Sequence, residues 1–541
     1  MKKIRNKILL AVIALVILFV YYYFALPAIN IHAVGFWQTV IFILAVVTVL
    51  YGVRIGIRKP NIQELKRSKG LLAGIGLIVL VVAIFAIGSL LSSPIINAKK
   101  YQKILSVEER NFSDDIEEVS FDKIPLLDRD SAELLGNRKM GSMVDMVSQY
   151  EVSSLYTQIN YQGTPVRVTP LCYANTIKWL TNQKTGLPAY IKIDMATQNV
   201  ECVKLSEGMK YSPYDHFNRN LYRHLRFSYP TYIFDDFNFE IDEDGVPYWI
   251  CPVKKYTIGL FGGQTIGRVV LCNAITGELQ DYPVEEVPSW VDRVYSPELL
   301  ISYYDYYGTL KHGYFNSVLG QKDCLQTTNG YNYVAMQDDV WVYTGITSVS
   351  GDQSNVGFVL MNQRTMETRF YSVEGAIEDS AMSSAEGQVQ NLGYVATFPL
   401  LLNIADEPTY FIALKDDAGL VKKYAMVNVQ KYQIVAIGDT VASCEEAYIS
   451  LLHTNGLKKE EKVETQTTTV TGVVDKSAQA VIDGNSHFYL LLQGSQEIYD
   501  VSVADTLQVL YVQEGDTVTL EYETKEDVNH VVSLKKEQIT E

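Results

Sequence analysis

The chain has 541 residues, among them 46 lysines and arginines, 62 aspartates and glutamates, six cysteines and 37 tyrosines. This length is enough for several domains. A mean hydropathy of +0.02 with 20% charged residues excludes a largely disordered chain and one that lies wholly within a membrane. Residues 1–100 carry twelve basic residues and one acidic residue, whereas the other 441 carry 34 basic and 61 acidic residues. These 441 residues have a net charge of −27, which argues against a nucleic-acid partner, because each phosphate contact needs a cation.

Three apolar runs near the N-terminus predict transmembrane helices. They cover Ile8–Leu26, Val34–Val53 and Leu71–Leu91, are 19, 20 and 21 residues long, and contain no acidic or basic side chain. Helices of this length cross a hydrocarbon core of about 30 Å. A cleavable signal peptide is the alternative for the first run, but no small-residue cleavage site follows Tyr21–Tyr23. We therefore predict a membrane anchor over residues 1–100 with three retained helices.

The basic residues near these runs predict an orientation. Four precede the first run and six lie between the second and third, whereas Pro27–Ala33 contains none. Because basic residues accumulate in cytoplasmic loops, we expect a cytoplasmic N-terminus and an extracytoplasmic chain from about residue 92 onward. Lys99, Lys100 and Lys103 are the opposing residues. The predicted location is the cell membrane, multi-pass, with the lipid bilayer as a partner.

Four segments beyond residue 100 predict β-hairpins of one pattern, in which an alternating strand ends in Asp or Asn before a polar turn. Any antiparallel protein contains hairpins, but four copies with the same turn polarity favour true repeats. An Asp or Asn side chain at a strand end can accept a hydrogen bond from the backbone two residues on. The segments are Ala189–Glu201, Gly267–Leu279, Gly357–Thr368 and Lys423–Ile434, with Asp194, Asn273, Asn362 and Asn428 at the turns.

Helical patterns alternate with these hairpins. One begins at the Ser296 cap with Pro297 at the first position, and a closing helix carries Val441, Cys444, Tyr448 and Leu451 on one face. Helices alternating with antiparallel strands predict a series of α+β units and not a doubly wound sheet. The helices that precede the hairpins are predicted over Ser131–Gln149, Tyr214–Arg226, Leu299–Tyr307 and Ala376–Val389.

The segment from Tyr248–Val253 to Val269–Glu278 resembles the PepSY module. The resemblance rests on Val-Leu-Cys-Asn-Ala-Ile-Thr-Gly-Glu, where Asn273 stands in place of the usual Asp, and only this unit retains Thr-Gly-Glu. It implies a helix packed on a short antiparallel sheet, extracytoplasmic and inhibitory or regulatory in function. The other units match as degenerate copies. The whole chain also resembles three-span membrane proteins of Gram-positive bacteria.

The chain after these units is predicted to form a separate small β domain. We expect PepSY-like α+β repeats over residues 101–453, a polar linker over 454–466 and an OB-like domain over 467–541. Five strands with a helix after the third are typical of an OB-type barrel, and a small sandwich is the alternative. The acid-rich composition provides no basic groove for nucleic acid. The predicted strands are Thr469–Val474, His487–Leu492, Glu497–Val503, Asp516–Tyr522 and Val528–Leu534.

Motifs for catalysis or metal binding are absent from the sequence. It contains no nucleophile elbow, zincin, Walker or dinucleotide-binding pattern, and no zinc-ligand spacing. Asp235, Asp236 and Glu240–Asp244 lack the alternating spacing of a calcium loop, so a solvated loop is favoured. Cys251 and Cys272 flank Gly262-Gly263 at 11 and 9 residues, so they form a cross-strand disulfide or two buried thiols. We predict no catalytic residue, no cofactor and no metal.

One basic face stands out on the predicted helix Tyr214–Arg226. His216, Arg219, Arg223 and Arg226 lie opposite an apolar stripe of Phe217, Leu221 and Leu225. This face is either a solvated surface paired with local acids or a site for an anionic cell-wall polymer or an acidic partner protein.

These patterns predict a membrane-anchored extracytoplasmic binding, regulatory or scaffold protein of the cell envelope, without enzymatic activity. Its sheets are expected to bind an envelope protein or a cell-wall polymer, and the many tyrosines suit such recognition faces. The alternative is a cell-envelope hydrolase or transferase whose active site the sequence motifs do not reveal.

Overall fold

The computed structural model describes residues 2–58, 68–116, 124–348, 354–457, 468–482, 485–503, 506–525 and 528–536. By its contacts the chain forms two units, Met1–Asn455 and Gly456–Glu541, which are described separately. The predicted domain boundaries stay predictions, and residues 458–466 of the predicted linker lie outside the described residues.

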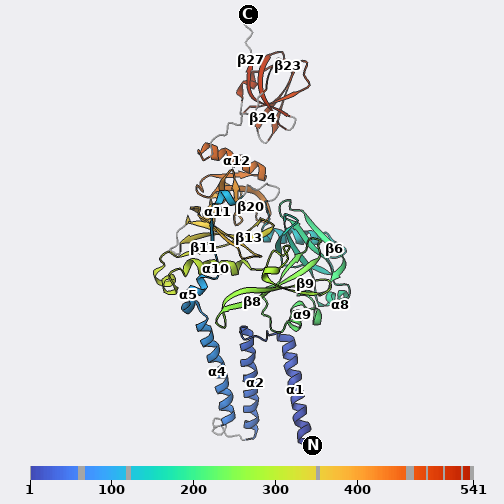
Figure 1. Ribbon diagram of the computed structural model, residues 1–541. Coiled ribbons are helices and arrows are strands. Elements are labelled where there is room, and N and C mark those ends of the chain that lie inside the picture. Colours follow the sequence, from blue (N-terminus) through green and yellow to red (C-terminus); the bar gives the residue numbers. More distant parts are fainter. Residues whose placement is uncertain are drawn as a thin grey trace. The chain divides into compact units, whose positions relative to one another are not determined.

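A helix occupies each of the three apolar runs: α1 (Lys2–Ala25), α2 (Val34–Arg58) and α4 (Lys69–Leu91) (Figure 1). Two segments, Val34–Ile55 and Lys69–Leu91, are long and apolar enough to cross a membrane, and none of the most apolar window of either is buried. A core helix of a soluble protein would bury such side chains. These two candidate spans agree with the sequence, and a third span over α1 stays a prediction.

The rest of the first unit is a mixed α+β structure of successive antiparallel sheets, as predicted. The first sheet contains β2 (Tyr150–Val152), β3 (Thr157–Tyr161), β4 (Thr164–Tyr173), β5 (Leu187–Asp194) and β6 (Val200–Met209). The second contains β7 (Asn238–Ile241), β8 (Pro247–Ile258), β9 (Gly262–Asn273) and β10 (Leu279–Pro283).

Two further sheets follow in the chain. The third contains β11 (Leu325–Thr327), β12 (Asn332–Met336), β13 (Asp339–Ser348), β15 (Gly357–Asn362) and β16 (Thr368–Tyr371), with β1 (Glu108–Arg110) parallel to β16. The fourth contains β18 (Val395–Ala396), β19 (Leu400–Ile404), β20 (Glu407–Lys415), β21 (Val421–Asn428) and β22 (Val435–Gly438). A short pair joins β14 (Ser354–Asn355) to β17 (Gly375–Ala376).

Most predicted helices are present with altered ends. The Ser296 hydroxyl caps α10 by accepting a hydrogen bond from the Leu299 N–H at 3.3 Å, as the sequence indicated. The helix predicted to run to Gln149 ends at Gly141. The helices are α5 (Pro94–Gln102), α6 (Phe112–Asp115), α7 (Arg129–Gly141), α8 (Thr176–Asn182), α9 (Leu221–Ser228), α10 (Pro297–Thr309), α11 (Glu378–Gln388) and α12 (Val441–Thr454).

The helix predicted over Tyr214–Arg226 is wrong in its first half. Phe217 has a φ of 54°, which an α-helix does not accommodate, and only a short 3₁₀ turn covers Phe217–Arg219. The helix α9 starts at Leu221, where the Asn220 side chain accepts a hydrogen bond from the Arg223 N–H. Phe217 is 63% exposed, whereas Leu221 and Leu225 are fully buried, so the predicted apolar stripe holds only in its second part.

The predicted turn chemistry is present in all four hairpins. The side-chain oxygen of each turn residue accepts hydrogen bonds from the N–H groups two and three residues on, at 2.8–3.1 Å. This closes the turn with the bonds expected of Asp or Asn at a strand end. The turn residues are Asp194, Asn273, Asn362 and Asn428, and descent from a PepSY module stays a prediction.

Replacement of Asn273 by Ala is expected to lower the free energy of unfolding by about 0.5–2 kcal/mol, by analogy with lost helix caps. The variant leaves the N–H groups of Ile275 and Thr276 without the oxygen that now accepts from both. Chemical denaturation measures the change. Asn273→Asp is the control, since its carboxylate keeps both bonds, and an unchanged stability of the Ala variant would mean that water replaces them at no cost.

The sheets pack on one another through shared apolar cores. One core joins the first and second sheets, a second joins the second and third, and another joins the third and fourth. Eight of the twelve largest fully buried side chains in the described part of the chain are tyrosines, so core packing uses many of them. The buried tyrosines are Tyr190, Tyr303, Tyr304, Tyr343, Tyr371, Tyr410, Tyr448 and Tyr499.

The C-terminal unit is a small closed barrel and not the alternative sandwich, which fits the OB-like prediction. Its strands pair in the order β23-β24-β25-β27-β26, and a 3₁₀ turn over Leu507–Tyr511 follows the third strand. This is the strand order of an OB barrel. The strands are β23 (Thr468–Ile482), β24 (Asn485–Leu492), β25 (Ile498–Ser502), β26 (Thr517–Lys525) and β27 (Val528–Lys536).

The six cysteines are free thiols. The β8–β9 hairpin turns between Ile258 and Gly262, so Cys251 lies opposite Val270, and Cys272 lies opposite Trp249. Cys251 and Cys272 are therefore out of register and both fully buried. The structure has the two buried thiols and not the cross-strand disulfide.

Candidate functional site

A cavity of about 330 Å³ lies where the first sheet meets the third and fourth. Its position follows from the packing of successive sheets, because residues distant in sequence converge there. A volume of this size suits a small ligand. The cavity is lined by Asp128, Arg129 and Asp130 at the start of α7, Tyr156, Gln158 and Arg167 of the first sheet, Arg293, Glu298, Tyr331, Asn332, Tyr333 and Phe398.

Arg167 is the most deeply buried cation of this cavity. It lies within β4, is 5% exposed, and has one hydrogen bond, from Nη2 to the Gln158 Oε1 at 3.3 Å. Burial lowers the pKa of Arg167, the charges of Tyr333 and Asp128 raise it, and the charges of Arg129 and Arg293 lower it. An arginine stays protonated even so, because its ordinary pKa exceeds 12. The cavity therefore contains a buried positive charge beside two further cations.

Four residues that line the cavity have buried polar atoms without a partner in the described part of the chain. These atoms are Nε of Arg167, Nε of Arg293, Nε2 of Gln158 and the hydroxyl of Tyr156. Each of them can donate a hydrogen bond. A buried donor that loses its bond to water costs free energy, so these four groups would be satisfied by a water or by a ligand with acceptor atoms.

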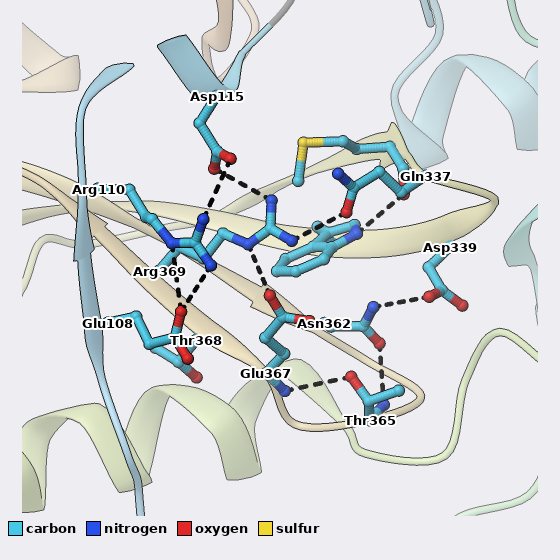
Figure 2. A network of polar contacts seen from close by, with 12 residues as sticks. Glu108, Arg110, Asp115, Gln337, Asp339, Asn362, Thr365, Glu367, Thr368 and Arg369 are labelled. Atoms are coloured by element: carbon cyan, nitrogen blue, oxygen red, sulfur yellow. Dashed lines mark hydrogen bonds and ion pairs between the residues drawn. The ribbon is translucent and has the colours of Figure 1, made fainter.

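The chain shows elsewhere how it satisfies a buried arginine. Arg369 is also 5% exposed, and it donates to Asp115 at 3.0 Å, to Glu367 at 2.7 Å and to Gln337 at 2.9 Å (Figure 2). Its guanidinium lies 4.5 Å from the centre of the Trp341 ring. Arg167 and Arg293 have no ion pair to a carboxylate within the described ranges. Equal burial without an ion pair distinguishes Arg167 from Arg369.

The mouth of the cavity carries carboxylates and aromatic rings. The Tyr331 hydroxyl donates to Glu298 at 2.8 Å, and the rings of Tyr331 and Tyr333 meet edge to face with centres 5.7 Å apart. Asp130 and Glu298 are exposed. Asp128 is already bonded to Lys415: burial alone would raise its pKa, but the bonds from Lys415 and Ser131 hold it below the ordinary value. Two accessible carboxylates thus remain beside the arginines.

A buried acid pair holds the loop that carries Arg293. Glu240 of β7 accepts hydrogen bonds from the N–H groups of Asp292 at 2.9 Å and Arg293 at 3.0 Å. Asp292 accepts one from the Asn160 N–H at 2.7 Å. Burial raises the pKa of Glu240 to about 7, and burial together with the charge of Glu240 raises that of Asp292. The prediction of a solvated loop is wrong for Glu240, which is fully buried.

The predicted basic face is divided among several contacts. The His216 ring meets the Trp179 ring edge-on at 4.5 Å, and Arg219 donates to the Gln183 carbonyl. Arg223 and Arg226 donate to the carbonyls of Tyr23 at 3.2 Å and Leu26 at 3.0 Å, at the end of α1. These two arginines of α9 thus join this helix to the end of α1. Binding of a partner by these four residues stays a prediction.

No group of three or more His, Cys, Asp or Glu side chains suited to a metal occurs among the described residues.

The sequence motifs did not reveal the cavity at Arg167. The available signal was a cation, Arg167, inside the otherwise uncharged strand Thr164–Tyr173.

Comparisons with known proteins show no family. No family model matches the chain, and no curated protein matches it. Among solved structures, a GH32 β-fructofuranosidase of Bombyx mori has 11% identity and a TM-score of 0.18, over 73% of this chain and 68% of that one.

The predicted function is at odds with this comparison. The solved structure is that of a hydrolase, whereas the sequence predicted a non-enzymatic binding, regulatory or scaffold protein, and that prediction is not carried further. A TM-score of 0.18 transfers no fold, substrate or catalytic residue. The alternative of a hydrolase or transferase must therefore rest on the geometry of this chain.

Proposed function

We propose that the chain is a membrane-anchored hydrolase or transferase whose cavity at Arg167 and Arg293 binds the anionic group of its substrate. The observation that carries the proposal is the set of unpartnered buried donors around this cavity. Guanidinium groups bind carboxylate or phosphate oxygens through paired, charge-assisted hydrogen bonds. Such an anion would supply the missing acceptors and the missing counter-charge in one step.

The same cavity offers groups for acid–base chemistry. Glu298 is exposed and accepts a hydrogen bond from Tyr331, so it can accept a proton from water or from an acceptor hydroxyl. The arginines would stabilise negative charge that develops on the bound group. Hydrolysis or transfer at a bond next to the anionic group fits this division of roles.

The test uses the full chain purified in detergent and a panel of phosphate and carboxylate esters. We expect turnover that inorganic phosphate inhibits. Glu298→Gln should lose at least tenfold in kcat while it retains binding, because general-base catalysis typically contributes about 10²–10⁴-fold. Arg138→Gln, on the exposed side of α7, is the control. Anion binding without turnover of any ester would contradict the enzymatic part of the proposal.

We also propose that α1, α2 and α4 cross the cell membrane with the N-terminus inside. A membrane-impermeant thiol reagent applied to intact cells should label a cysteine placed within residues 454–466 and should not label one placed at Ser68. The parent chain for this experiment has its six cysteines replaced, so that only the new thiol reacts. The reverse labelling pattern would contradict the orientation.

A further inference from the structure

A second cavity, of about 500 Å³, lies between the loop that joins α1 to α2 and the second sheet. Asn30 and His32 of that loop contribute to its wall, together with Tyr232, Lys254, Lys255 and Arg268. It shares no residue with the cavity at Arg167.

Direct contacts fix this second cavity at the ends of the apolar helices. The Ile29 N–H donates to the Pro230 carbonyl at 2.8 Å, and the Asn30 side chain donates to the Thr231 carbonyl at 2.9 Å. The tip of the β8–β9 hairpin also packs there, where the Phe261 ring lies 5.0 Å from Phe85 of α4. Figure 1 shows β8 and β9 next to the ends of α1, α2 and α4.

The side chains of the cavity leave one positive charge uncompensated. Lys254 is paired with Asp235 at 3.0 Å, and Arg268 is paired with Asp281 at 2.8 Å. Lys255 is exposed and has no ion pair in the part of the chain that the structure describes. His32 is held through Nδ1 by the Leu260 carbonyl at 2.7 Å, and its ring stacks on Tyr256.

We propose that this cavity binds the phosphate of an anionic phospholipid in the leaflet next to the second sheet. A phosphodiester carries one negative charge, which the ammonium of Lys255 would balance. The remaining N–H donors of Lys254 and Arg268 lie in the same wall. The acyl chains would continue along the exposed apolar side chains of the helices, such as Ile87 and Leu90 of α4. The inference rests on the membrane crossing proposed above.

The experiment places the full chain in nanodiscs of phosphatidylcholine that contain a minor fraction of phosphatidylglycerol. The lipids retained after detergent extraction are then counted by native mass spectrometry. We expect phosphatidylglycerol to be enriched on the wild type and Lys255→Ala to reduce that enrichment about tenfold, as for other lost charge-assisted bonds. Lys431→Ala changes an exposed lysine in the turn between β21 and β22 and should have no effect.

Three results would overturn the inference. The first is equal retention of both lipids, and the second is enrichment that Lys255→Ala does not reduce. The third is saturable binding of soluble glycerol phosphate as tight as that of the lipid, which would make a free phosphate compound the ligand. Flotation of the nanodiscs checks membrane insertion separately, so a chain that fails to insert contradicts the proposed anchor itself. Binding at Arg167 is unaffected by any of these outcomes.

Discussion

Replacement of Arg167 by Met is expected to stabilise the ligand-free protein and to abolish its binding of anions. Arg167 is 5% exposed and has neither a carboxylate partner nor a bond at Nε within the described ranges. Replacing a whole buried ion pair by apolar side chains is often neutral or stabilises by about 1–4 kcal/mol, and a buried charge without a partner lacks even the attraction that a pair gains. An arginine with a purely structural role would give the opposite result, because its loss would destabilise the fold.

Thermal unfolding in the presence of phosphate or sulfate separates these cases. A ligand that binds only the folded state raises the melting temperature as its concentration rises. We expect both anions to stabilise the wild type and Arg138→Met, which alters an exposed arginine of α7, but not Arg167→Met. Arg167→Lys should keep the charge and lose most of the affinity, since lysine lacks the paired donors. Equal anion stabilisation of wild type and Arg167→Met would exclude this cavity as the binding site.

The local parts of the fold could be predicted from the sequence because they depend on neighbouring residues. The Ser296 cap, the turns at Asp194 and Asn273, and the strands of the C-terminal barrel all follow from short patterns. The start of α9 could not be predicted in this way. The helical periodicity of Phe217, Leu221 and Leu225 continued through a residue that adopts a positive φ.

The candidate site could not be predicted because it depends on contacts between distant segments. Arg167 and Arg293 are brought together by the packing of successive sheets, and neither belongs to a recognisable motif. The three arginines and the histidine of the predicted basic face illustrate the converse. Their spacing suggested one free surface, but Arg223 and Arg226 bind the carbonyls at the end of α1, which sequence spacing does not reveal.

The stability of the protein is expected to fall as the pH rises from 5 to 8, and Glu240 is expected to cause much of this loss. Its pKa in the folded protein is about 7, raised from 4.5 by burial, so the folded state binds a proton that the unfolded state has released. The contribution of Glu240 to the stability of the fold is therefore complete below pH 4.5 and is lost as the pH rises through 7. Asp128, whose pKa is lowered, acts in the opposite direction and only at acidic pH.

Chemical denaturation of wild type and Glu240→Gln at pH 5, 6, 7 and 8 isolates this contribution. Other titrating groups, such as Asp215 with a pKa of about 6, are common to both proteins and cancel in the difference. We expect Glu240→Gln to have a lower free energy of unfolding than the wild type at pH 5. The difference should shrink towards pH 8. A difference in unfolding free energy between the two proteins that does not change with pH would contradict the assignment of this pH dependence to Glu240. Asp292→Asn tests the coupling, because the charge of Glu240 helps to raise the pKa of Asp292.

The titration of Glu240 should also change the affinity of the cavity at Arg167 for anions. Glu240 holds the backbone N–H groups of Asp292 and Arg293, and the Arg293 side chain lines the proposed anion site at Arg167. When Glu240 and Asp292 are both ionised, their repulsion in a buried site opposes the position of this loop in which Glu240 accepts from both N–H groups. Anion affinity measured by the shift in melting temperature should therefore decrease between pH 6 and 8 in the wild type. Glu240→Gln should flatten that decrease, because the amide carries no titrating charge and its one oxygen still accepts from one of the two N–H groups.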